Sequence, residues 1–154
     1  MRSESIVVVA EDPSGADAVS LMAELDRELR TMYPDASIHG ATPAELLVPR
    51  ASFLVARIGG QAVGCGALRP LDDTAAEVKR MFVRAEFRGR GIGRIVLLEL
   101  ESVARARGFR TLRLETGSAQ PEAIRLYESE GYRRIPAFGE YADDPRSVCF
   151  EKEI

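Results

Sequence analysis

Hydrophobic residues follow two kinds of spacing along this chain of 154 residues. Between residues 19 and 32 they recur every three or four positions, which is the spacing of a helix with one buried face. Elsewhere they form short runs bounded by Gly, Pro or Asp, which is typical of strands. In chain order the predicted elements are a buried strand 5–10, a helix marked by apolar residues at 19, 22, 25, 29 and 32, a short helix opening at 42–45, strands 53–58, 61–68 and 76–83, a helix 91–107, a strand 111–115, a helix 121–130, and strands 132–135 and 147–153.

Turn and capping residues support these boundaries. Gly59-Gly60 separates two strand-like runs and predicts a hairpin with a two-residue turn. Thr42-Pro43-Ala44-Glu45 has the form of a capping box with proline at the first helical position. Gly108 is expected to end the long helix in the left-handed conformation, and Gly131 follows the next helix. The chain therefore predicts strands and helices joined by short connections.

Composition and charge narrow the class of protein. Hydrophobic residues make up 45% of the chain and no repeat or linker divides it, so we expect one domain over residues 1–154. The net charge of −3 argues against a general nucleic-acid binder. Cys65 and Cys149 show no CxxC spacing and no histidine cluster accompanies them, so neither a metal site nor a disulfide framework is expected. The apolar run at residues 6–10 is too short for a signal peptide or a membrane span, which predicts a soluble cytoplasmic protein.

The segment most informative about function is Arg88-Gly89-Arg90-Gly91-Ile92-Gly93-Arg94, between a predicted strand and a predicted helix. Glycines let successive backbone N–H groups converge, and the start of a helix adds partial positive charge. The segment therefore predicts an anion-binding loop, best suited to a pyrophosphate. It lacks the Gly-Lys-Ser/Thr ending of a Walker loop, and Arg94 or Val96 occupies the last glycine position of a dinucleotide-binding G-x-G-x-x-G. An ordinary turn decorated with arginines is the alternative.

Arg88, Gly91 and Gly93 also fit the pattern Arg/Gln-x-x-Gly-x-Gly/Ala, which is the acetyl-CoA loop of the GCN5-related N-acetyltransferase (GNAT) superfamily. Residues 120–127, followed by Gly131-Tyr132, resemble the second motif of that family, N-x-x-A-x-x-L-Y-x-x-x-G-F/Y. The predicted order of strands and helices is also similar to the GNAT order. The resemblance, to small bacterial single-domain members, implies an α/β (α+β) fold with a mixed, mostly antiparallel sheet of about six to seven strands flanked by about four helices.

The resemblance implies an acetyl-CoA-dependent N-acetyltransferase that passes the acetyl group directly to a primary amine in a ternary complex, with no metal. The acceptor would be a small molecule, or a protein or peptide amine. A non-catalytic acyl-CoA-binding or regulatory module is the alternative, although it would need neither Glu77 nor Tyr127. A third hypothesis is an RNA-associated or ribosomal-protein-modifying protein that uses arginines at positions 80, 84, 88, 90 and 94, and the negative net charge counts against it. The resemblance also admits a homodimer formed through the C-terminal strands.

By the same resemblance, two parts of the chain bind acetyl-CoA. The loop arginines supply charge to the phosphates, and the backbone amides of residues 89–94 donate hydrogen bonds to them. The backbone of the preceding strand binds the pantetheine arm, with one amide facing the thioester oxygen. Gln120 stands where the family often has asparagine and is expected to hydrogen-bond a pantetheine amide. The implied cofactor-binding residues are Met81, Phe82, Val83, Arg88, Gly89, Arg90, Gly91, Ile92, Gly93, Arg94 and Gln120.

Two side chains are candidates for proton transfer. Tyr127 occupies the position where the family places a tyrosine near the CoA sulfur, so its phenol would donate to the leaving thiolate; packing within its helix is the alternative. Glu77 lies eleven residues before the first loop arginine, like the strand glutamate that serves as base in the histone acetyltransferase branch. Strand alternation would place Glu77, Lys79, Met81 and Val83 on one face, so the lysine would favour the carboxylate form of Glu77. A structural or substrate-orienting role for Glu77 is the alternative.

The sequence defines the acceptor site less closely. Residues 138–145 form an acidic loop between the last two strands, which would suit a cationic amine, and Tyr141 within this loop is a candidate to line the site. Tyr33, near the end of the first helix, and His39, just after it, are weaker candidates because relatives line the acceptor pocket from this region. The alternatives are a solvated turn for the loop and a surface position for His39. Cys65 is expected to fill space in the core rather than to carry the acetyl group.

Overall fold

The computed structural model describes residues 5–34 and 40–154. Within these residues seven strands form one sheet, in the order β1-β2-β3-β4-β5-β7-β6. Neighbouring strands run antiparallel except β4 and β5, which are parallel. The elements are β1 (Ile6–Ala10), α1 (Ala16–Met32), η1 (Ala44–Leu46), β2 (Ser52–Ile58), β3 (Gln61–Pro70), β4 (Ala75–Val83), η2 (Ala85–Phe87), α2 (Ile92–Ala106), β5 (Thr111–Gly117), α3 (Pro121–Ser129), β6 (Arg133–Ile135), η3 (Gly139–Tyr141) and β7 (Ser147–Glu153), where η denotes a 3-10 helix.

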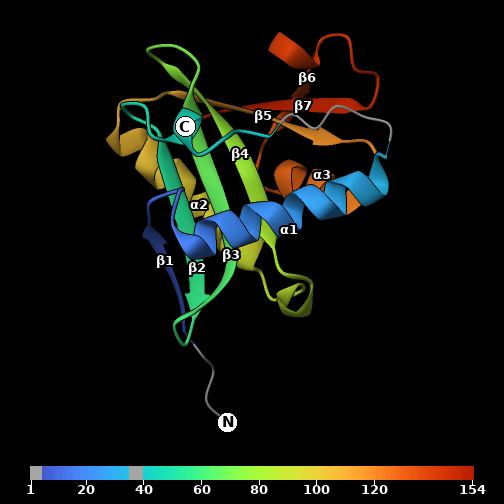
Figure 1. Ribbon diagram of the computed structural model, residues 1–154. Coiled ribbons are helices and arrows are strands. Elements are labelled where there is room, and N and C mark those ends of the chain that lie inside the picture. The colour runs from blue at the N-terminus through green and yellow to red at the C-terminus, as the bar shows by residue number, and fades with distance from the viewer. Residues whose placement is uncertain (1–4, 35–39) are drawn as a thin grey trace.

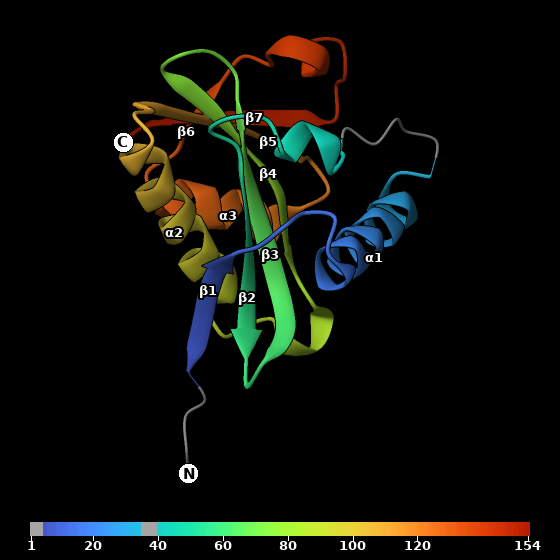
Figure 2. The same cartoon turned by 60° about the vertical axis from the view of Figure 1, so that its left-hand side comes forward.

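Helices cover both faces of the sheet (Figures 1 and 2). Helix α1 lies on one face, where Leu21 and Leu25 pack with Phe53 in one hydrophobic cluster. Helices α2 and α3 lie on the opposite face and help to bury a larger cluster, which includes Leu100 from α2 and Leu112 from β5. The predicted architecture of a mixed, mostly antiparallel sheet between helices is therefore confirmed, and burial of both faces explains why the central strands are so apolar.

The first strand and the first helix are less buried than the sequence predicted. β1 is an edge strand, and Val7 and Val9 are 52% and 39% exposed because α1 lies across β3 and β4 and leaves this side of β1 uncovered. In α1, Val19 is exposed while Ala18 is buried. Met22 and Leu25 of the predicted stripe are buried as expected, whereas Val19 and Met32 are exposed, so the buried stripe is shifted toward Ala18 and Leu21.

The predicted short second helix is a single 3-10 turn. Its capping box is present, since the Thr42 backbone N–H donates to Glu45 Oε1 at 3.3 Å and the Glu45 N–H donates to Thr42 Oγ1 at 3.4 Å. Pro49 follows soon after Leu46 and would break the hydrogen bonds of a longer helix. The capping prediction is confirmed and the predicted helix is too long.

Strands β4 and β5 separate part of the way along their length. Their parallel pairing runs from Ala75↔Thr111 to Val78↔Leu114. Beyond that pair β4 continues to Val83 and β5 to Gly117, and these described residues do not pair with each other. The two strands therefore leave an opening in the middle of the sheet, where unpaired backbone of β4 is available to a ligand.

A bulge in β4 lies beside this opening and changes which side chains face each way. The register against β3 shifts between Cys65 and Ala67, opposite Arg80, whose φ of 59° is left-handed. After the bulge, Phe82 joins the cluster under α1, whereas Met81 packs with the cluster under α2 and α3. The expectation that Glu77, Lys79, Met81 and Val83 share one face is therefore wrong, because the extra residue inverts the alternation.

Candidate active site

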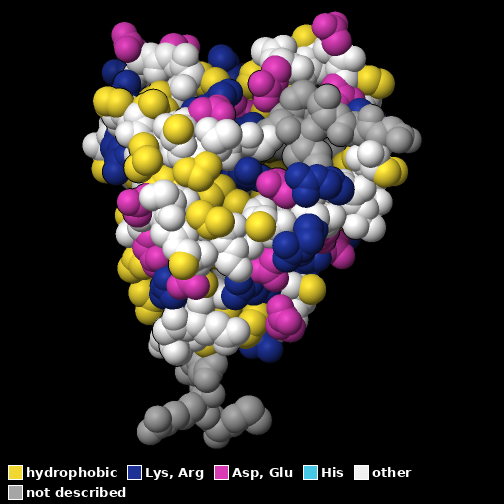
Figure 3. All heavy atoms as spheres, in the orientation of Figure 1, with side chains coloured by type: hydrophobic (Ala, Val, Ile, Leu, Met, Phe, Trp, Pro, Cys, Tyr) yellow, Lys and Arg dark blue, Asp and Glu magenta, His cyan; other side chains and the backbone are white. Residues whose placement is uncertain are grey.

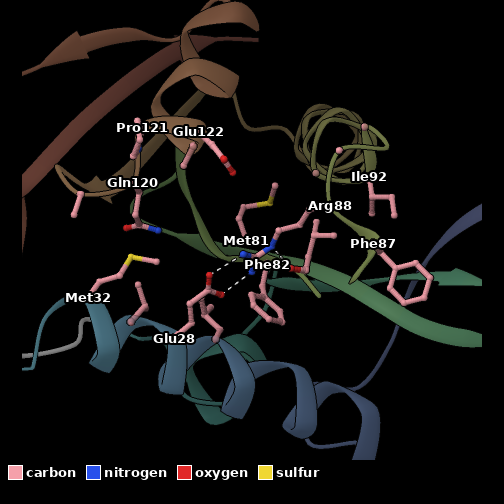
Figure 4. A pocket seen from close by; sticks show the side chains of 18 residues that line it. Glu28, Met32, Met81, Phe82, Phe87, Arg88, Ile92, Gln120, Pro121 and Glu122 are labelled. Atoms are coloured by element: carbon pink, nitrogen blue, oxygen red, sulfur yellow. Dashed lines mark hydrogen bonds and ion pairs between the residues drawn. The ribbon is translucent and has the colours of Figure 1, made fainter. Parts of the chain in front are cut away.

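The glycine-rich loop forms the mouth of a cavity of about 450 Å³ at the start of α2. Gly91 is the N-cap of α2 with φ 78°, and Gly89 has φ 81°, a conformation that glycine adopts readily. A Cβ added at either position would meet no atom within 4 Å, so both glycines face open space. Side chains that line the cavity come from α1, β4, the loop and α3 (Figure 4). The lining residues are Leu25, Glu28, Leu29, Met32, Met81, Phe82, Val83, Phe87, Arg88, Gly89, Gly91, Ile92, Gly93, Ala119, Gln120, Pro121, Glu122 and Ala123.

Arg88 joins this loop to α1. Its Nη1 and Nη2 donate to Glu28 Oε1 and Oε2 at 2.8 and 2.6 Å, and its Nε donates to the Val83 carbonyl oxygen at 2.8 Å (Figure 4). The guanidinium carbon also lies 5.6 Å from the centre of the Phe82 ring. Arg88 therefore lies at the predicted ligand site, with a structural contact on each of its three nitrogens.

The other two loop arginines lie apart from Arg88. Arg94 pairs with Glu130 at 3.2 Å and donates to Ser129 Oγ at 3.2 Å, at the end of α3. The exposed Arg90 lies 5.2 Å from the centre of the Phe87 ring. The arrangement provides an anion cradle made mainly of backbone N–H groups at a helix start, with arginines at its rim.

A second cavity, of about 160 Å³, lies at the opening between β4 and β5. It shares Leu25, Leu29, Met81, Gln120 and Ala123 with the first cavity, so the two meet there. Its lining residues are Leu25, Leu29, Gly40, Val78, Lys79, Arg80, Met81, Glu115, Thr116, Gln120, Ala123 and Tyr127.

Tyr127 lines this second cavity from α3 and is 5% exposed. Its ring packs edge-on against Tyr132, with ring centres 5.9 Å apart, and lies 6.2 Å from Phe150. Burial, and then the negative charge of Glu115, raises the pKa of the Tyr127 phenol. The hydroxyl therefore stays protonated throughout the physiological pH range, as a hydrogen-bond donor must.

Glu77 lies at the centre of a buried network and lines neither of the two cavities. Its carboxylate is completely buried and accepts hydrogen bonds from Arg69 Nη2 at 2.8 Å and from the Tyr141 hydroxyl at 2.6 Å. Lys79 Nζ lies 3.7 Å from Glu77 Oε2 and donates to the Tyr141 hydroxyl at 2.6 Å. Burial, and then the charge of Glu77, raises the pKa of Tyr141. The network connects both predicted residues, Glu77 and Tyr141, to Lys79 on the cavity wall.

The remaining predicted residues have local roles in the structure. The Tyr33 hydroxyl accepts a hydrogen bond from the Ala119 N–H at 3.0 Å, which links the end of α1 to the β5–α3 connection. Gln120 lines both cavities, and its Oε1 accepts from the Gly117 N–H at 2.9 Å. His39 lies outside the described residues.

Glu115 is a cavity residue that the sequence reasoning missed. It follows the last β4–β5 pair, and its Oε2 accepts a hydrogen bond from Ser147 Oγ at 2.6 Å. Leu112 and Leu114 are buried under α2 and α3, so Glu115 points to the other face of β5. The available signal was a single acidic residue, Glu115, in a strand whose alternate positions are apolar. Its role depends on the opening between β4 and β5, which the sequence did not predict.

The arginine-rich face also bears on the nucleic-acid hypothesis. Arg80 and Arg84 pair with Asp26 at 2.6 Å and Glu24 at 2.7 Å, on the same helix that supplies Glu28 to the loop. Figure 3 shows basic and acidic side chains interspersed over this face. The described arginines there are thus compensated by acids and do not form a continuous basic surface.

Comparison with known proteins now identifies the family. The sequence model described as "Acetyltransferase (GNAT) family" matches residues 18–132. The chain belongs to this family. The "IAA acetyltransferase" of Azospirillum brasilense is 41% identical to this GNAT chain over 151 residues, which are 97% of this chain and 99% of that protein. The chain is therefore a GNAT-type acetyltransferase.

Solved structures support the same fold. A crystal structure from Klebsiella pneumoniae is 35% identical and matches with a TM-score of 0.82 over 96% of this chain and 97% of that one. A GNAT family acetyltransferase from Elizabethkingia anophelis with acetyl-CoA bound has a TM-score of 0.71 at 18% identity, over 97% of this chain and 98% of that one. Among residues 5–34 and 40–154 of this GNAT chain, no group of three or more His, Cys, Asp or Glu could hold a metal ion, and no helix is long and apolar enough to cross a membrane.

Proposed function

We propose that this GNAT chain transfers the acetyl group of acetyl-CoA directly to a primary amine of a small molecule, with donor and acceptor bound together. The observation that carries this proposal is the meeting of two cavities at the opening between β4 and β5. The larger one begins at the anion cradle, and the smaller one holds charged side chains. Two ligands bound from the two sides would bring their reacting groups together there.

The larger cavity fits the shape and charge of the CoA arm. The start of α2, with Gly89 and Gly91 open to solvent, suits the pyrophosphate. The unpaired edge of β4 at Met81–Val83 suits the amides of the pantetheine, which would add to it like a further strand. Gln120 lines both cavities, at the point where the pantetheine arm would reach the smaller one. Its side-chain amide would form a hydrogen bond with the pantetheine.

Tyr127 is positioned to assist the leaving group. As the amine nitrogen bonds to the carbonyl carbon, the C–S bond breaks and negative charge forms on the sulfur. Because the pKa of Tyr127 is raised, its phenol is a weaker acid than in water. We therefore assign it hydrogen-bond donation to the thiolate, and the proton that the sulfur finally takes comes from the amine or from solvent.

Deprotonation of the amine has two carboxylate candidates. Glu115 lines the cavity that would hold the amine, so it is our first choice to bind the ammonium group and accept its proton, directly or through water. Glu77 would have to act through Tyr141 and Lys79, and its buried contacts suit a positioning residue for these two side chains. A base role for Glu77 stays a prediction.

Initial-rate kinetics test the proposal. The purified chain is assayed for free-thiol release with acetyl-CoA and a panel of amines, and both concentrations are varied for the best acceptor. We expect double-reciprocal lines that intersect, because both substrates bind before any product leaves. Parallel lines would overturn direct transfer, and calorimetric binding of acetyl-CoA without thiol release for any amine would instead support the non-catalytic acyl-CoA-binding alternative.

A further inference from the structure

The smaller cavity is lined by residues whose polar side chains are almost completely buried. The Lys79 side chain is 7% exposed and the Arg80 side chain 9%, and Thr116 is 6% exposed. Burial of charged groups is costly unless they are paired or used by a ligand. At about 160 Å³ the cavity is smaller than the first, of about 450 Å³, so we expect it to hold a small polar molecule.

Lys79 is held in place by a chain of hydrogen bonds. Its ammonium group donates to Tyr141 at 2.6 Å, Tyr141 donates to Glu77 at 2.6 Å, and Arg69 holds the other oxygen of Glu77 at 2.8 Å. The chain contains 19 arginines and just two lysines. A lysine at position 79 therefore differs from the basic residue that this chain uses almost everywhere else. A lysine is a compact point charge, which fits a small cavity better than the planar guanidinium of arginine.

Lys79 and Glu115 lie across the opening from each other. Val78 and Leu114 are the last paired residues of β4 and β5, and both are buried under α2 and α3. Lys79 follows Val78 and Glu115 follows Leu114, so both side chains point to the α1 face, one from each side of the opening. Arg80 lines the cavity on the Lys79 side, but its charge is compensated, because its guanidinium pairs with Asp26 at 2.6 Å and donates to the Ala41 carbonyl oxygen at 2.9 Å.

The acids of the predicted acidic loop lie outside the lining of the two cavities. Glu140 and Asp143 are exposed, Asp144 accepts hydrogen bonds from Arg146, and none of the three lines either cavity. Glu115 is thus the acid among the described residues that line the smaller cavity, and Lys79 lies across from it. A polyamine would bring a second ammonium group against Lys79, whereas a molecule with both a carboxylate and an amine would be complementary to Lys79 and Glu115.

We propose that the acceptor is an α-amino acid or a closely related small amino-carboxylate. Its carboxylate binds to Lys79, and its amine lies toward Glu115 and the opening. This inference rests on the proposed acetyl transfer and names the class of acceptor. Specificity arises because an acceptor with a carboxylate gains an ion pair with Lys79 that an amine without the carboxylate cannot form.

Matched acceptors test this assignment. Free-thiol release is measured for each L-amino acid and for the amine that remains when its carboxylate is removed, with butylamine and spermidine as further acceptors. We expect at least one amino acid to have a kcat/KM about 10²-fold above that of its matched amine. Equal or better turnover of the amines would overturn the inference and leave the acetyltransferase proposal intact. If acetyl-CoA binds but no thiol is released with these acceptors, nor with any other amine, the transfer proposal and this inference would both be overturned.

Two lysine variants separate recognition from stability. Lys79→Met keeps the aliphatic stem and removes the charge, so the preference for the amino acid over its matched amine should fall from about 10²-fold to a few fold, while calorimetric acetyl-CoA affinity is retained. Lys152→Met is the matched control, because Lys152 Nζ binds Glu101 at 3.0 Å and lines neither cavity. It should lower Tm and leave the preference unchanged. An unchanged preference in Lys79→Met would assign carboxylate recognition elsewhere.

Glu115→Gln distinguishes the two ends of the acceptor. It should lower kcat/KM for amino acids and for their matched amines by similar factors, because both carry the amine that Glu115 faces. The preference between them should persist, since Lys79 is intact. Loss of the preference in Glu115→Gln with retention in Lys79→Met would reverse the proposed orientation and overturn it.

Discussion

The two cavities that meet at the opening in the sheet are built from different chemical groups. The larger one is lined by glycine backbone, the edge of β4, the start of α2 and apolar side chains, with Glu28, Arg88 and Glu122 among the charged ones. The smaller one is lined in part by charged side chains of β4 and β5, of which Lys79 belongs to a network that reaches Tyr141 in η3. Under the proposed function, main-chain geometry would contribute most to recognition in the first cavity, and many sequences can supply it. Side chains, which a few substitutions change, would contribute most in the second.

The largest effect is expected from adding a side chain at Gly91, in the anion-binding loop at the start of α2. Gly91→Val should abolish measurable acetyl-CoA binding, a loss of more than about 10³-fold for a micromolar ligand, because the new side chain enters the open space in front of α2. Isothermal titration calorimetry measures the effect. Gly60→Val is the matched control, since Gly60 has a similar φ of 83°, is equally open and lies in the β2–β3 turn. Wild-type affinity in Gly91→Val would show that the loop is an ordinary turn.

A second prediction concerns Tyr127, which lines the smaller cavity. Tyr127→Phe should lower kcat by about 10²-fold and leave acetyl-CoA affinity near that of the wild type, because the hydroxyl acts on the charge that develops on sulfur. The pKa of Tyr127 is raised, so the phenol stays protonated up to at least about pH 10 and its ionisation causes no loss of rate below that pH. Rate measurements from pH 7 to 10 check the second point. An unchanged kcat in Tyr127→Phe would leave the residue with its packing role alone.

A smaller effect is expected from the arginine that the motif emphasises. Arg88→Gln should weaken acetyl-CoA binding by about tenfold, because its guanidinium already contacts Glu28 and Val83 and is partly exposed to screening solvent. Arg84→Gln is the control. Arg84 forms a comparable ion pair with Glu24 of α1 at 2.7 Å and lines neither cavity, so affinity should be retained. A loss in Arg88→Gln as large as that in Gly91→Val would mean that side chains, not the backbone, dominate phosphate binding.

The difference between the cavities also explains what the sequence could predict. The order of elements, the hairpin turn and the glycine-rich loop depend on residues close together in the chain, and all three are found in the structure. The bulge at Arg80 and the separation of β4 from β5 depend on the register in which whole strands pair, which local sequence patterns do not specify. Glu28 and Arg88 are sixty residues apart, so no local pattern could join them. Glu115 gains its significance from the opening beside it, which periodicity does not predict.

The smallest effect is expected from Cys65, a core residue that contacts the bulge in β4. Cys65 is completely buried on β3, and its thiol donates to the carbonyl oxygen of Arg80 in the bulge at 3.2 Å. Burial raises the pKa of Cys65 to about 12, so at pH 8 about one thiol in 10⁴ is ionised. A thiol in that state is a poor nucleophile, which argues against an acetyl-cysteine intermediate and agrees with direct transfer.

Cys65→Ala should therefore keep kcat within about twofold of the wild type, and iodoacetamide at pH 8 should leave the native wild-type enzyme active. Mass spectrometry after incubation with acetyl-CoA alone, without an acceptor, provides the direct measurement. An acetyl group on Cys65 would show that the chain reacts in two steps through a covalent enzyme. In that case the two cavities would be filled in turn, and their meeting at the opening would no longer require both ligands at once.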